Sequence, residues 1–206
     1  MNIKIINSFQ TDENTYIVYD NNKTGFVIDP GNSDEKIIKT CEELGVVIDK
    51  IILTHCHYDH IEFLENLREK SNAQLVCTKK CSENIGKLGV NLSCLGLGRE
   101  IKAKEAQIIL NDGETIKIGN MDIKCIHTPG HTDCSACFMV ENNIFSGDTL
   151  FLRSCGRWDL PTGDGEIIKK SIKEKLYTLN DDVVVYPGHG NKTTIGYEKK
   201  YNLCIR

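Results

Sequence analysis

Residues 54–60 read Thr54-His55-Cys56-His57-Tyr58-Asp59-His60 and bring three imidazoles and a carboxylate within a few positions of one another. The stretch directly follows Lys50–Leu53, an apolar segment that we predict to be a strand. Three protonated imidazoles at this spacing would repel one another, and unpaired polar groups are costly to bury. A bound cation resolves both problems. The stretch therefore predicts a metal site at the end of a strand.

Three more polar residues stand in the same position relative to a predicted strand. His131 follows Ile126–Gly130, Asp148 follows Ile144–Gly147, and His189 follows Val185–Gly188. A strand carries its last residue to the rim of a sheet, and a glycine turn there presents the next side chain at a fixed angle. We therefore expect four strand ends to converge on one site.

The donor set indicates which ions such a site would hold. Imidazoles with carboxylates suit zinc, iron or manganese, whereas calcium and magnesium prefer shells of oxygen ligands. The candidates outnumber the ligands of one tetrahedral ion, so the economical assignment is two divalent ions that share the carboxylate of Asp148. Zinc is the first expectation, with iron and manganese as alternatives. The candidate ligands are His55, His57, Asp59, His60, His131, Asp148 and His189, and Asp59 is also the candidate catalytic residue.

Size and composition predict one globular domain over residues 1–206. The net charge of -4 gives no basic surface that would attract nucleic acid or anionic lipid. The opening residues form too short an apolar stretch for a secretory signal, and no segment is long enough to span a bilayer. We expect a cytoplasmic protein that acts on a small molecule, has no nucleic-acid or membrane partner, and keeps its ten cysteines as free thiols.

Strand and helix patterns alternate along the chain. The predicted strands are Ile3–Ile6, Asn14–Tyr19, Gly25–Asp29, Lys50–Thr54, Gln74–Cys77, Ile108–Leu110, Glu114–Ile118, Asp122–His127, Ala136–Glu141, Asn143–Ser146 and Val183–Tyr186. The predicted helices are Asp34–Leu44, His60–Lys70 and Gly165–Leu179. Residues 82–105 show neither helical nor strand periodicity and predict a loop or insertion. Residues 193–206 give no clear pattern. Because both halves run from strands to a helix, we expect one layered sandwich.

The motifs resemble a known family, the metallo-β-lactamase-fold hydrolases, and within it the glyoxalase II-like (hydroxyacylglutathione hydrolase-like) group of single-domain type. The resemblance spans roughly residues 12–190 and rests on residues 54–60, His127-Thr128-Pro129-Gly130-His131-Thr132, Phe145-Ser146-Gly147-Asp148-Thr149-Leu150-Phe151, Gly156-Arg157-Trp158-Asp159-Leu160-Pro161 and Pro187-Gly188-His189-Gly190. It implies an α+β fold, the αββα sandwich, with two mixed sheets flanked by helices. It also implies that His55, His57 and His131 hold one metal, that Asp59, His60 and His189 hold the second, and that Asp148 lies between them.

By the same resemblance, the expected activity is hydrolysis of a thioester, such as an S-acylglutathione-like compound, by a hydroxide that bridges the two metals. A thiolate, with a reference pKa of about 8.5, leaves without a strong general acid, which suits a site made of ligands alone. We expect no counterpart of the helical domain that, by the resemblance, helps two-domain glyoxalase II hold glutathione, which leaves the thiol open. Arg157 stands in a segment that replaces a lysine–tyrosine pair of those enzymes, and it is a candidate for binding a substrate carboxylate.

Other functions compete with this interpretation. In a persulfide dioxygenase, His55, His131 and Asp148 would form a two-histidine, one-carboxylate iron site with open positions for oxygen. The number of bound ions distinguishes the two enzymes, because the hydrolase would hold two ions and the dioxygenase one iron. A binding module with purely structural ions is a third reading, and β-lactamase activity is disfavoured because, by resemblance, lactamases lack an aspartate at the place of Asp148.

Several polar residues near the candidate ligands are not expected to bind metal. His127 lies four positions before His131 and is expected to support the site or the strand. Cys56 lies between two ligands, and the alternation of side-chain directions turns it away from the ions. Cys134 and Cys137 are spaced as C-x-x-C but enter a strand pattern, where they point to opposite faces, so neither a redox nor a metal role is expected.

Overall fold

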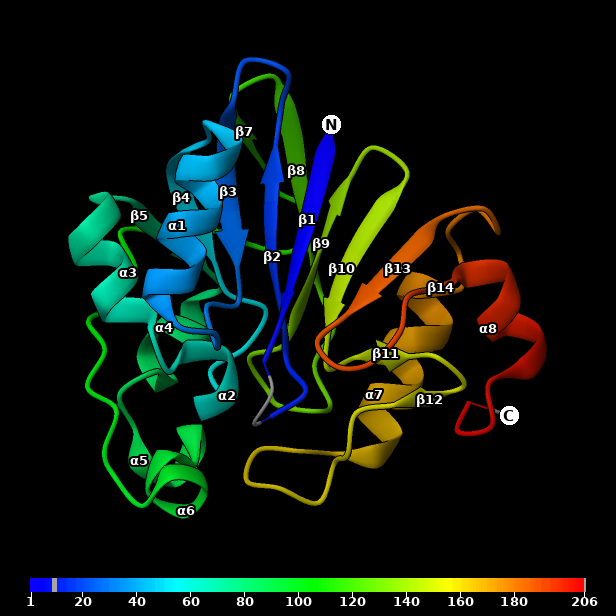
Figure 1. The fold of residues 1–206 in the computed structure, drawn as a ribbon. Helices are drawn as coiled ribbons and strands as arrows, with labels where there is room; N and C mark the ends of the chain where they lie inside the picture. Colours follow the sequence, from blue (N-terminus) through cyan, green and yellow to red (C-terminus); the bar gives the residue numbers. More distant parts are fainter. Residues whose placement is uncertain (9–10, 206) are drawn as a thin grey trace.

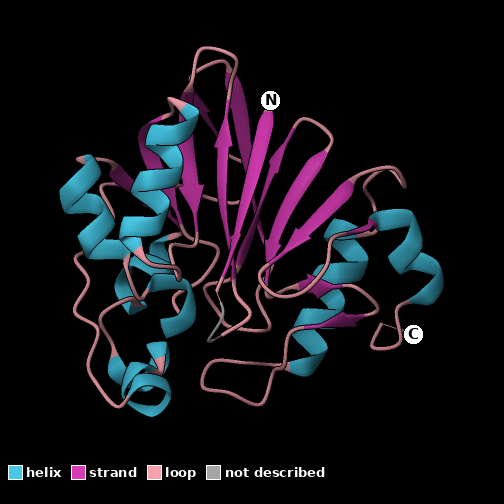
Figure 2. Ribbon diagram, viewed as in Figure 1, coloured by secondary structure: helices cyan, strands magenta, loops and turns pink. Residues whose placement is uncertain are grey.

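Two β-sheets pack face to face and helices cover both outer faces in the computed structural model, which describes residues 1–8 and 11–205 (Figure 1, Figure 2). This four-layer arrangement confirms the predicted αββα sandwich. The predicted domain also includes residues 9, 10 and 206, which lie outside the described residues. No helix of the described residues is long and apolar enough to cross a bilayer.

The first sheet has the strand order β1-β2-β3-β4-β5-β6. Its strands are β1 (Asn2–Asn7), β2 (Asn14–Tyr19), β3 (Thr24–Ile28), β4 (Val47–Ile52), β5 (Gln74–Cys77) and β6 (Ile108–Ile109). The pairs from β1 to β3 are antiparallel and those from β3 to β6 are parallel, so the sheet is mixed as predicted. The parallel pairs are joined through helices, as parallel strands require.

The second sheet has the order β14-β13-β10-β9-β8-β7. Its strands are β7 (Thr115–Ile118), β8 (Met121–His127), β9 (Ala136–Val140), β10 (Asn143–Gly147), β13 (Val184–Pro187) and β14 (Thr193–Thr194). Only the pair of β10 and β13 is parallel. A separate two-stranded ribbon joins β11 (Leu150–Phe151) to β12 (Ser154–Cys155).

Helices lie against the outer face of each sheet (Figure 1). Those of the first half are α1 (Asp34–Leu44), α2 (Tyr58–Ile61), α3 (Leu64–Ser71), α4 (Lys79–Asn84), α5 (Leu88–Asn91) and α6 (Ser93–Leu97). Those of the second half are α7 (Gly165–Ser171), a π-helical turn η1 (Ile172–Leu176) and α8 (Ile195–Tyr201). Gly45, at a φ of 68°, ends α1, and its N–H donates to the carbonyls of Cys41 and Glu42.

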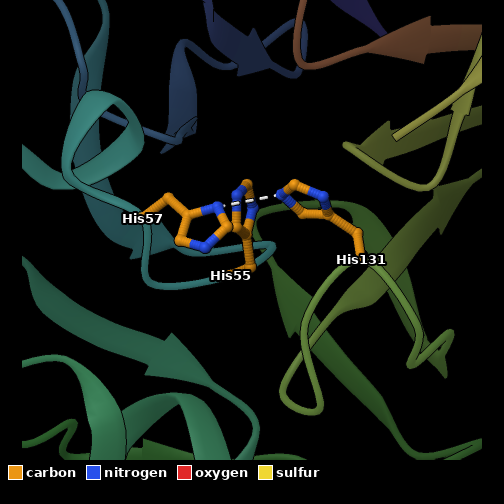
Figure 3. A group of neighbouring side chains, drawn as sticks. All are labelled: His55, His57 and His131. Carbon is orange, nitrogen blue, oxygen red and sulfur yellow. Dashed lines mark hydrogen bonds between the residues drawn. The ribbon is translucent and has the colours of Figure 1, made fainter. Parts of the chain in front are cut away.

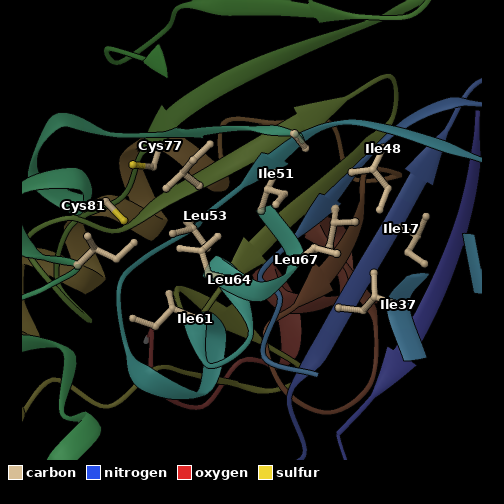
Figure 4. Close-up of a cluster of buried hydrophobic side chains, with 14 of the residues drawn as sticks. Ile17, Ile37, Ile48, Ile51, Leu53, Ile61, Leu64, Leu67, Cys77 and Cys81 are labelled. Carbon is tan, nitrogen blue, oxygen red and sulfur yellow. The ribbon is translucent and has the colours of Figure 1, made fainter. Parts of the chain in front are cut away.

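Residues of central strands such as β2 and β3 alternate between two cores because both faces of these strands are buried. Ile17 and Ile51 pack under the helices of the first half, where Figure 4 shows them with Ile37 and Leu67. Ile52, which follows Ile51 in β4, points the other way, into the core between the sheets. Full burial of each such side chain contributes about 1.5–3 kcal/mol, so the apolar runs of the central strands fix which face each residue takes.

The structure corrects four of the sequence-based element assignments. The helix predicted at His60–Lys70 is two helices, α2 and α3, because the N–H of Phe63 donates to the carbonyl of Pro30, 3.1 Å away. The helix predicted at Gly165–Leu179 is α7 followed by η1, where the Tyr177 N–H donates to the Ile172 carbonyl. Residues 82–105, predicted as a loop, contain α5 and α6, which are too short to show a period. Residues 193–206, which gave no pattern, contain β14 and α8.

Candidate metal centre

The seven predicted ligands converge at one end of the sandwich, where strands of both sheets end. His55 and His57 follow β4, Asp59 and His60 lie in α2, His131 follows β8, Asp148 follows β10, and His189 follows β13. The sequence therefore placed every candidate at the edge where the structure brings them together. These strand ends share one edge because β4 belongs to one sheet and β8, β10 and β13 to the other, and the two sheets face each other.

Three histidines form the first group. Figure 3 shows His55, His57 and His131 with their rings turned toward a common point, and one ring nitrogen from each lies within 4.8 Å of the others. His57 Nδ1 and His131 Nε2 are 2.9 Å apart. Two imidazole nitrogens bound to one tetrahedral zinc ion at 2.0–2.1 Å would lie about 3.3 Å apart. The spacing of this pair is close to that of two ligands of one ion.

Asp59, His60 and His189 form the second group. The Nε2 atom of His189 lies 3.2 Å from Asp59 Oδ2, and the Nε2 atom of His60 lies 3.8 Å from the same oxygen. His60 is fully buried, whereas His189 is partly exposed toward solvent. The second group is therefore the more open one.

The carboxylate of Asp148 faces both groups. Its Oδ1 lies 3.4 Å from His60 Nε2, and its Oδ2 lies 3.5 Å from His131 Nε2 and 3.6 Å from His189 Nε2. Gly188 allows this approach, since a Cβ there would lie 2.2 Å from Asp148 Oδ1. The position is the one that a carboxylate shared between two cations requires.

Buried polar atoms without a hydrogen-bond partner collect at this point. They include the Nε2 atoms of His55, His57 and His60 and the Oδ1 atom of Asp148. Leaving such atoms unpaired costs about 1–3 kcal/mol each, more for charged groups, and native structures rarely leave several together. The nitrogen and carboxylate donors fit a pair of divalent cations that would satisfy them.

The charges of the site favour a cation as well. Burial lowers the pKa of His55 well below its usual value and that of His57 to about 4, so both rings are neutral and keep a free lone pair. Burial alone would raise the pKa of Asp148, but the surrounding histidines outweigh it and hold that pKa well below its usual range. The first group thus has two neutral imidazoles beside an ionised carboxylate, as metal binding needs. In the second group burial would lower the pKa values of His60 and His189, but the carboxylates of Asp148 and Asp59 outweigh it and raise them, so these rings favour positive charge at the place where a cation would bind.

Hydrogen bonds behind the ligands fix the orientation of their rings. His131 Nδ1–H donates to the Arg157 carbonyl at 2.7 Å, and His60 Nδ1–H donates to Asp29 Oδ2 at 2.9 Å. In both rings the other nitrogen, Nε2, is left to face the site. A metal-binding histidine commonly donates its second N–H to a carboxylate or carbonyl in this way.

Asp29 is a functional residue that the sequence analysis missed. Its Oδ1 accepts the Thr54 N–H at 2.8 Å, while its Oδ2 accepts the Thr54 hydroxyl at 2.6 Å besides His60. Asp29 also lies within ligand distance of His55 and His60, but these three donors already occupy its oxygens, so it orients ligands rather than adding one. A signal was present, because Asp29 ends a strand before Pro30-Gly31, the same placement as the ligands.

The loop that carries His189 is tied to the N-terminal part of the chain. The Asn14 side chain donates to the carbonyls of Pro187 at 3.0 Å and Gly190 at 2.9 Å, and the Asn14 N–H donates to the Gly188 carbonyl at 2.8 Å. Asn14 is 2% exposed, so water does not compete for these bonds. The position of His189 therefore depends on a residue that lies far from it in the sequence.

The residues that were not expected to bind metal lie apart from the two ligand groups. His127 Nε2 is 3.2 Å from the Leu110 carbonyl, away from both groups. Cys56 turns into the core under the helices, where its Sγ is 3.6 Å from that of Cys134. Cys137 packs into the core on the other side of the second sheet, so the two cysteines of the C-x-x-C spacing point to different cores.

The two groups lie at the floor of a cavity of about 470 Å³. His57, Asp59, His131, Asp148 and His189 reach into it, and the other lining residues are Tyr58, Leu92, Leu95, Gly96, Phe151, Arg157 and Leu160. Trp158 is not among them and lies beside Gly165 and Lys169. The cavity is large enough for a small organic molecule to reach the metal ligands.

Known proteins share this fold and much of this sequence. A hydroxyacylglutathione hydrolase GloC of Haemophilus influenzae is 32% identical over 205 residues, which cover 98% of this chain and 97% of that protein. The crystal structure of BLEG-1 B3 metallo-β-lactamase matches with a TM-score of 0.93 at 32% identity, and 99% of each chain is covered.

Two other solved structures are also similar. TTHA1623 in a di-iron-bound form has a TM-score of 0.81 at 29% identity, with 98% of this chain and 99% of that chain covered. ETHE1 from Myxococcus xanthus has a TM-score of 0.83 at 27% identity, with coverage of 98% and 84%. The family model described as the metallo-beta-lactamase superfamily matches residues 10–189. The model spans both metal-ligand groups, and the chain belongs to the metallo-β-lactamase superfamily.

Proposed function

We propose that this protein is a hydrolase that holds two divalent metal ions and cleaves a thioester. The observation that carries the proposal is the carboxylate of Asp148, which faces both ligand groups while buried nitrogens around it lack partners. His55, His57 and His131 would hold one ion, Asp59, His60 and His189 the other, and Asp148 would bridge them. The similarity to a hydroxyacylglutathione hydrolase supports the choice of a thioester.

Two cations held by these residues would supply Lewis-acid chemistry, lowering the pKa of a bound water to about 7. The chain's own groups keep that chemistry in place. Asp29 and the Arg157 carbonyl hold the rings of His60 and His131 in one orientation, so the donor atoms are positioned before substrate enters. No side-chain acid near the cavity is required, because a thiolate leaves readily at neutral pH.

Zinc is our first choice of metal, because a histidine and carboxylate donor set suits it and the first group has the spacing of a tetrahedral site. Iron and manganese accept the same donors. The di-iron form of TTHA1623, at 29% identity, supports two ions rather than one and keeps iron open. Elemental analysis of protein purified without added metal decides the identity and the number.

The test of function is release of free thiol from acyl thioesters by protein of known metal content. We expect thiol release that rises with metal content to two ions per chain and stops after chelation. A β-lactam serves as the comparison substrate, because BLEG-1 is named as a lactamase. Hydrolysis of the β-lactam without thioester cleavage would contradict the proposal, as would full activity in metal-free protein.

A persulfide dioxygenase is the second candidate, supported by the similarity to ETHE1 and by the two histidines and one carboxylate of His55, His131 and Asp148. Such an enzyme needs one iron, and the three donors of the second group would then have no role. That group favours the hydrolase. Oxygen uptake on addition of a persulfide, with one iron per chain, would reverse the choice.

A further inference from the structure

Apolar side chains form two facing walls above the metal ligands. On one side, Leu92 and Leu95 come from the segment Leu88–Leu97, which contains α5 and α6. On the other side stand Phe151 of β11 and Leu160. Leu95 is 81% exposed and is among the residues that line the cavity, so its side chain is free to contact a bound molecule.

Buried hydrogen bonds fix the conformation of the segment that carries the leucines. Asn91 is fully buried, and its side chain donates to the Ile85 carbonyl at 2.8 Å and accepts the Ser93 N–H at 2.9 Å. Ser93, also fully buried, accepts the Ile101 N–H at 3.1 Å. These buried polar contacts hold α5 and α6 in one conformation, so the exposure of Leu95 is imposed by the fold.

The wall is docked onto the helix that supplies two metal ligands. A Cβ on Gly96 would lie 2.2 Å from the ring of Tyr58, so glycine is needed for α6 to approach α2 this closely. Glu62 accepts a hydrogen bond from Arg99 at 2.6 Å and joins the same two segments. Through these contacts the leucines keep a fixed position relative to Asp59 and His60.

The mouth of the cavity offers little net charge to a ligand. Arg157 is the only charged side chain among the non-ligand lining residues in the described part of the chain. Its guanidinium donates two hydrogen bonds, both 2.7 Å long, to the carboxylate of Asp159. The pair is neutral as a whole. The arrangement therefore gives an anionic substrate group less attraction than a lone arginine would.

We propose that Leu92, Leu95, Phe151 and Leu160 form a subsite for an unbranched aliphatic group attached to the thioester carbonyl or to its sulfur, so that neutral, aliphatic thioesters are the preferred substrates. The inference rests on the proposed function and adds the substrate class. Each methylene that leaves water contributes about 0.8 kcal/mol, which corresponds to about a fourfold gain in kcat/KM. The gain continues until the group fills the space between the walls.

Two substrate series decide which side of the thioester binds there. The first varies the acyl group (acetyl, butyryl, hexanoyl) on the neutral thiol N-acetylcysteamine. The second keeps the acetyl group and varies the thiol (ethanethiol, hexanethiol, glutathione). We expect kcat/KM to rise by about fourfold per methylene in one series. Equal values across both series, or a preference for glutathione with no effect of chain length, would overturn the subsite.

Variants test whether the leucine wall causes the preference. Leu95→Asp places a charge in the proposed subsite without disturbing a buried position, and we expect it to abolish the rise of kcat/KM with chain length. Leu203→Asp is the control, because Leu203 is also exposed (57%) but lies outside the cavity. Leu203→Asp should keep the wild-type dependence of kcat/KM on chain length. An unchanged dependence in Leu95→Asp contradicts the assignment.

A binding measurement separates failure of the subsite from failure of the proposed function. Calorimetry with metal-loaded protein compares hexanoate with acetate and hexanethiol with ethanethiol. If no thioester is cleaved, the hydrolase proposal fails. The subsite is then supported if the longer ligand of a pair binds more tightly to the wild type but not to Leu95→Asp. Equal affinities within both pairs would contradict the subsite.

Discussion

Removing the charge of Asp148 tests whether the two ligand groups form one metal centre. Asp148→Asn keeps the shape of the side chain but removes the negative charge between His60 and His131. We expect this variant to lose both ions and at least about 10²-fold in kcat, the scale on which loss of one electrostatic group acts in catalysis. Elemental analysis and a thioester assay measure the two effects.

His189→Ala should behave differently, because His189 belongs to the second group and lies at the solvent side of the site. We expect one ion to remain per chain. His127→Ala is the matched control, since this histidine contacts the Leu110 carbonyl instead of the ligands. Full metal content and activity in both Asp148→Asn and His189→Ala would end the two-metal assignment.

Asp29 allows the supporting hydrogen bonds to be tested separately from the ligands. In Asp29→Asn the new amide N–H groups would face the Thr54 hydroxyl or the His60 ring, both of which donate to the carboxylate in the wild type. Asparagine tolerates the φ of 50° at this position, so the backbone is preserved. We expect about 10–100-fold weaker binding of the second ion, measured by competition with a chelator.

A purely structural role of Asp29 gives a different result. It would lower the melting temperature of metal-free protein and leave the metal affinity of the folded fraction unchanged. The effect on the first group should be smaller, because Asp29 reaches His55 only through the Thr54 hydroxyl, which lies 3.0 Å from His55 Nδ1.

Sequence reasoning predicted the candidate ligands but not the residues that support them, for a physical reason. The ligands cluster in the chain or follow strand–glycine signals, and both patterns are local. The contact between Asp29 and His60 spans 31 positions, and the partner of His131 is a backbone carbonyl, which any residue at position 157 would provide. The placement of Asp29 before Pro30-Gly31 marks it as a strand-end residue, but nothing in the sequence pairs it with His60 or pairs residue 157 with His131.

Strands were easier to predict than short helices. The strands of the sandwich are buried on one or both faces, so their apolar patterns are strong. By contrast, α5 has four residues and α6 five, less than two turns each, and Leu92 between them has a φ of 62°. Their positions depend on contacts such as that of Gly96 with Tyr58. The segment that forms the proposed substrate wall was therefore the one that the pattern could not resolve.

Gly96→Ala tests the docking of α6 on α2. The added methyl group would overlap the Tyr58 ring, and overpacking of this kind costs about 1–3 kcal/mol of unfolding free energy. Gly89→Ala in α5 is the control, because a Cβ there meets no atom within 4 Å and should leave stability equal or slightly higher. Urea denaturation measures both. Equal stabilities for the two variants would show that the contact is not tight in solution.

Bound metal should stabilise the chain as a whole, because the ligands come from both sheets and assemble only in the folded state. At a metal concentration of 100 times Kd, each ion adds about 2.7 kcal/mol to the unfolding free energy. In a chain of this size, each kcal/mol shifts Tm by about 2–4 °C. We expect chelation to lower Tm by about 5–10 °C per ion lost, with recovery when metal is returned.

Scanning calorimetry with parallel elemental analysis makes this measurement decisive. A Tm that stays constant while the ions are removed would mean that the groups do not hold metal in the folded protein, or hold it equally well when unfolded. The Asp148→Asn variant should show a low Tm that added metal does not restore.

The tie between Asn14 and the loop of His189 has a consequence for how the protein is made. Translation delivers Asn14 long before Pro187–Gly190, so the acceptors of its side chain are absent while most of the chain emerges from the ribosome. His55, His57 and His131 are all available before residue 189. A nascent chain can therefore complete the three-histidine group first, and the second group closes only when the late β13 loop docks beside the strand that was synthesised near the start.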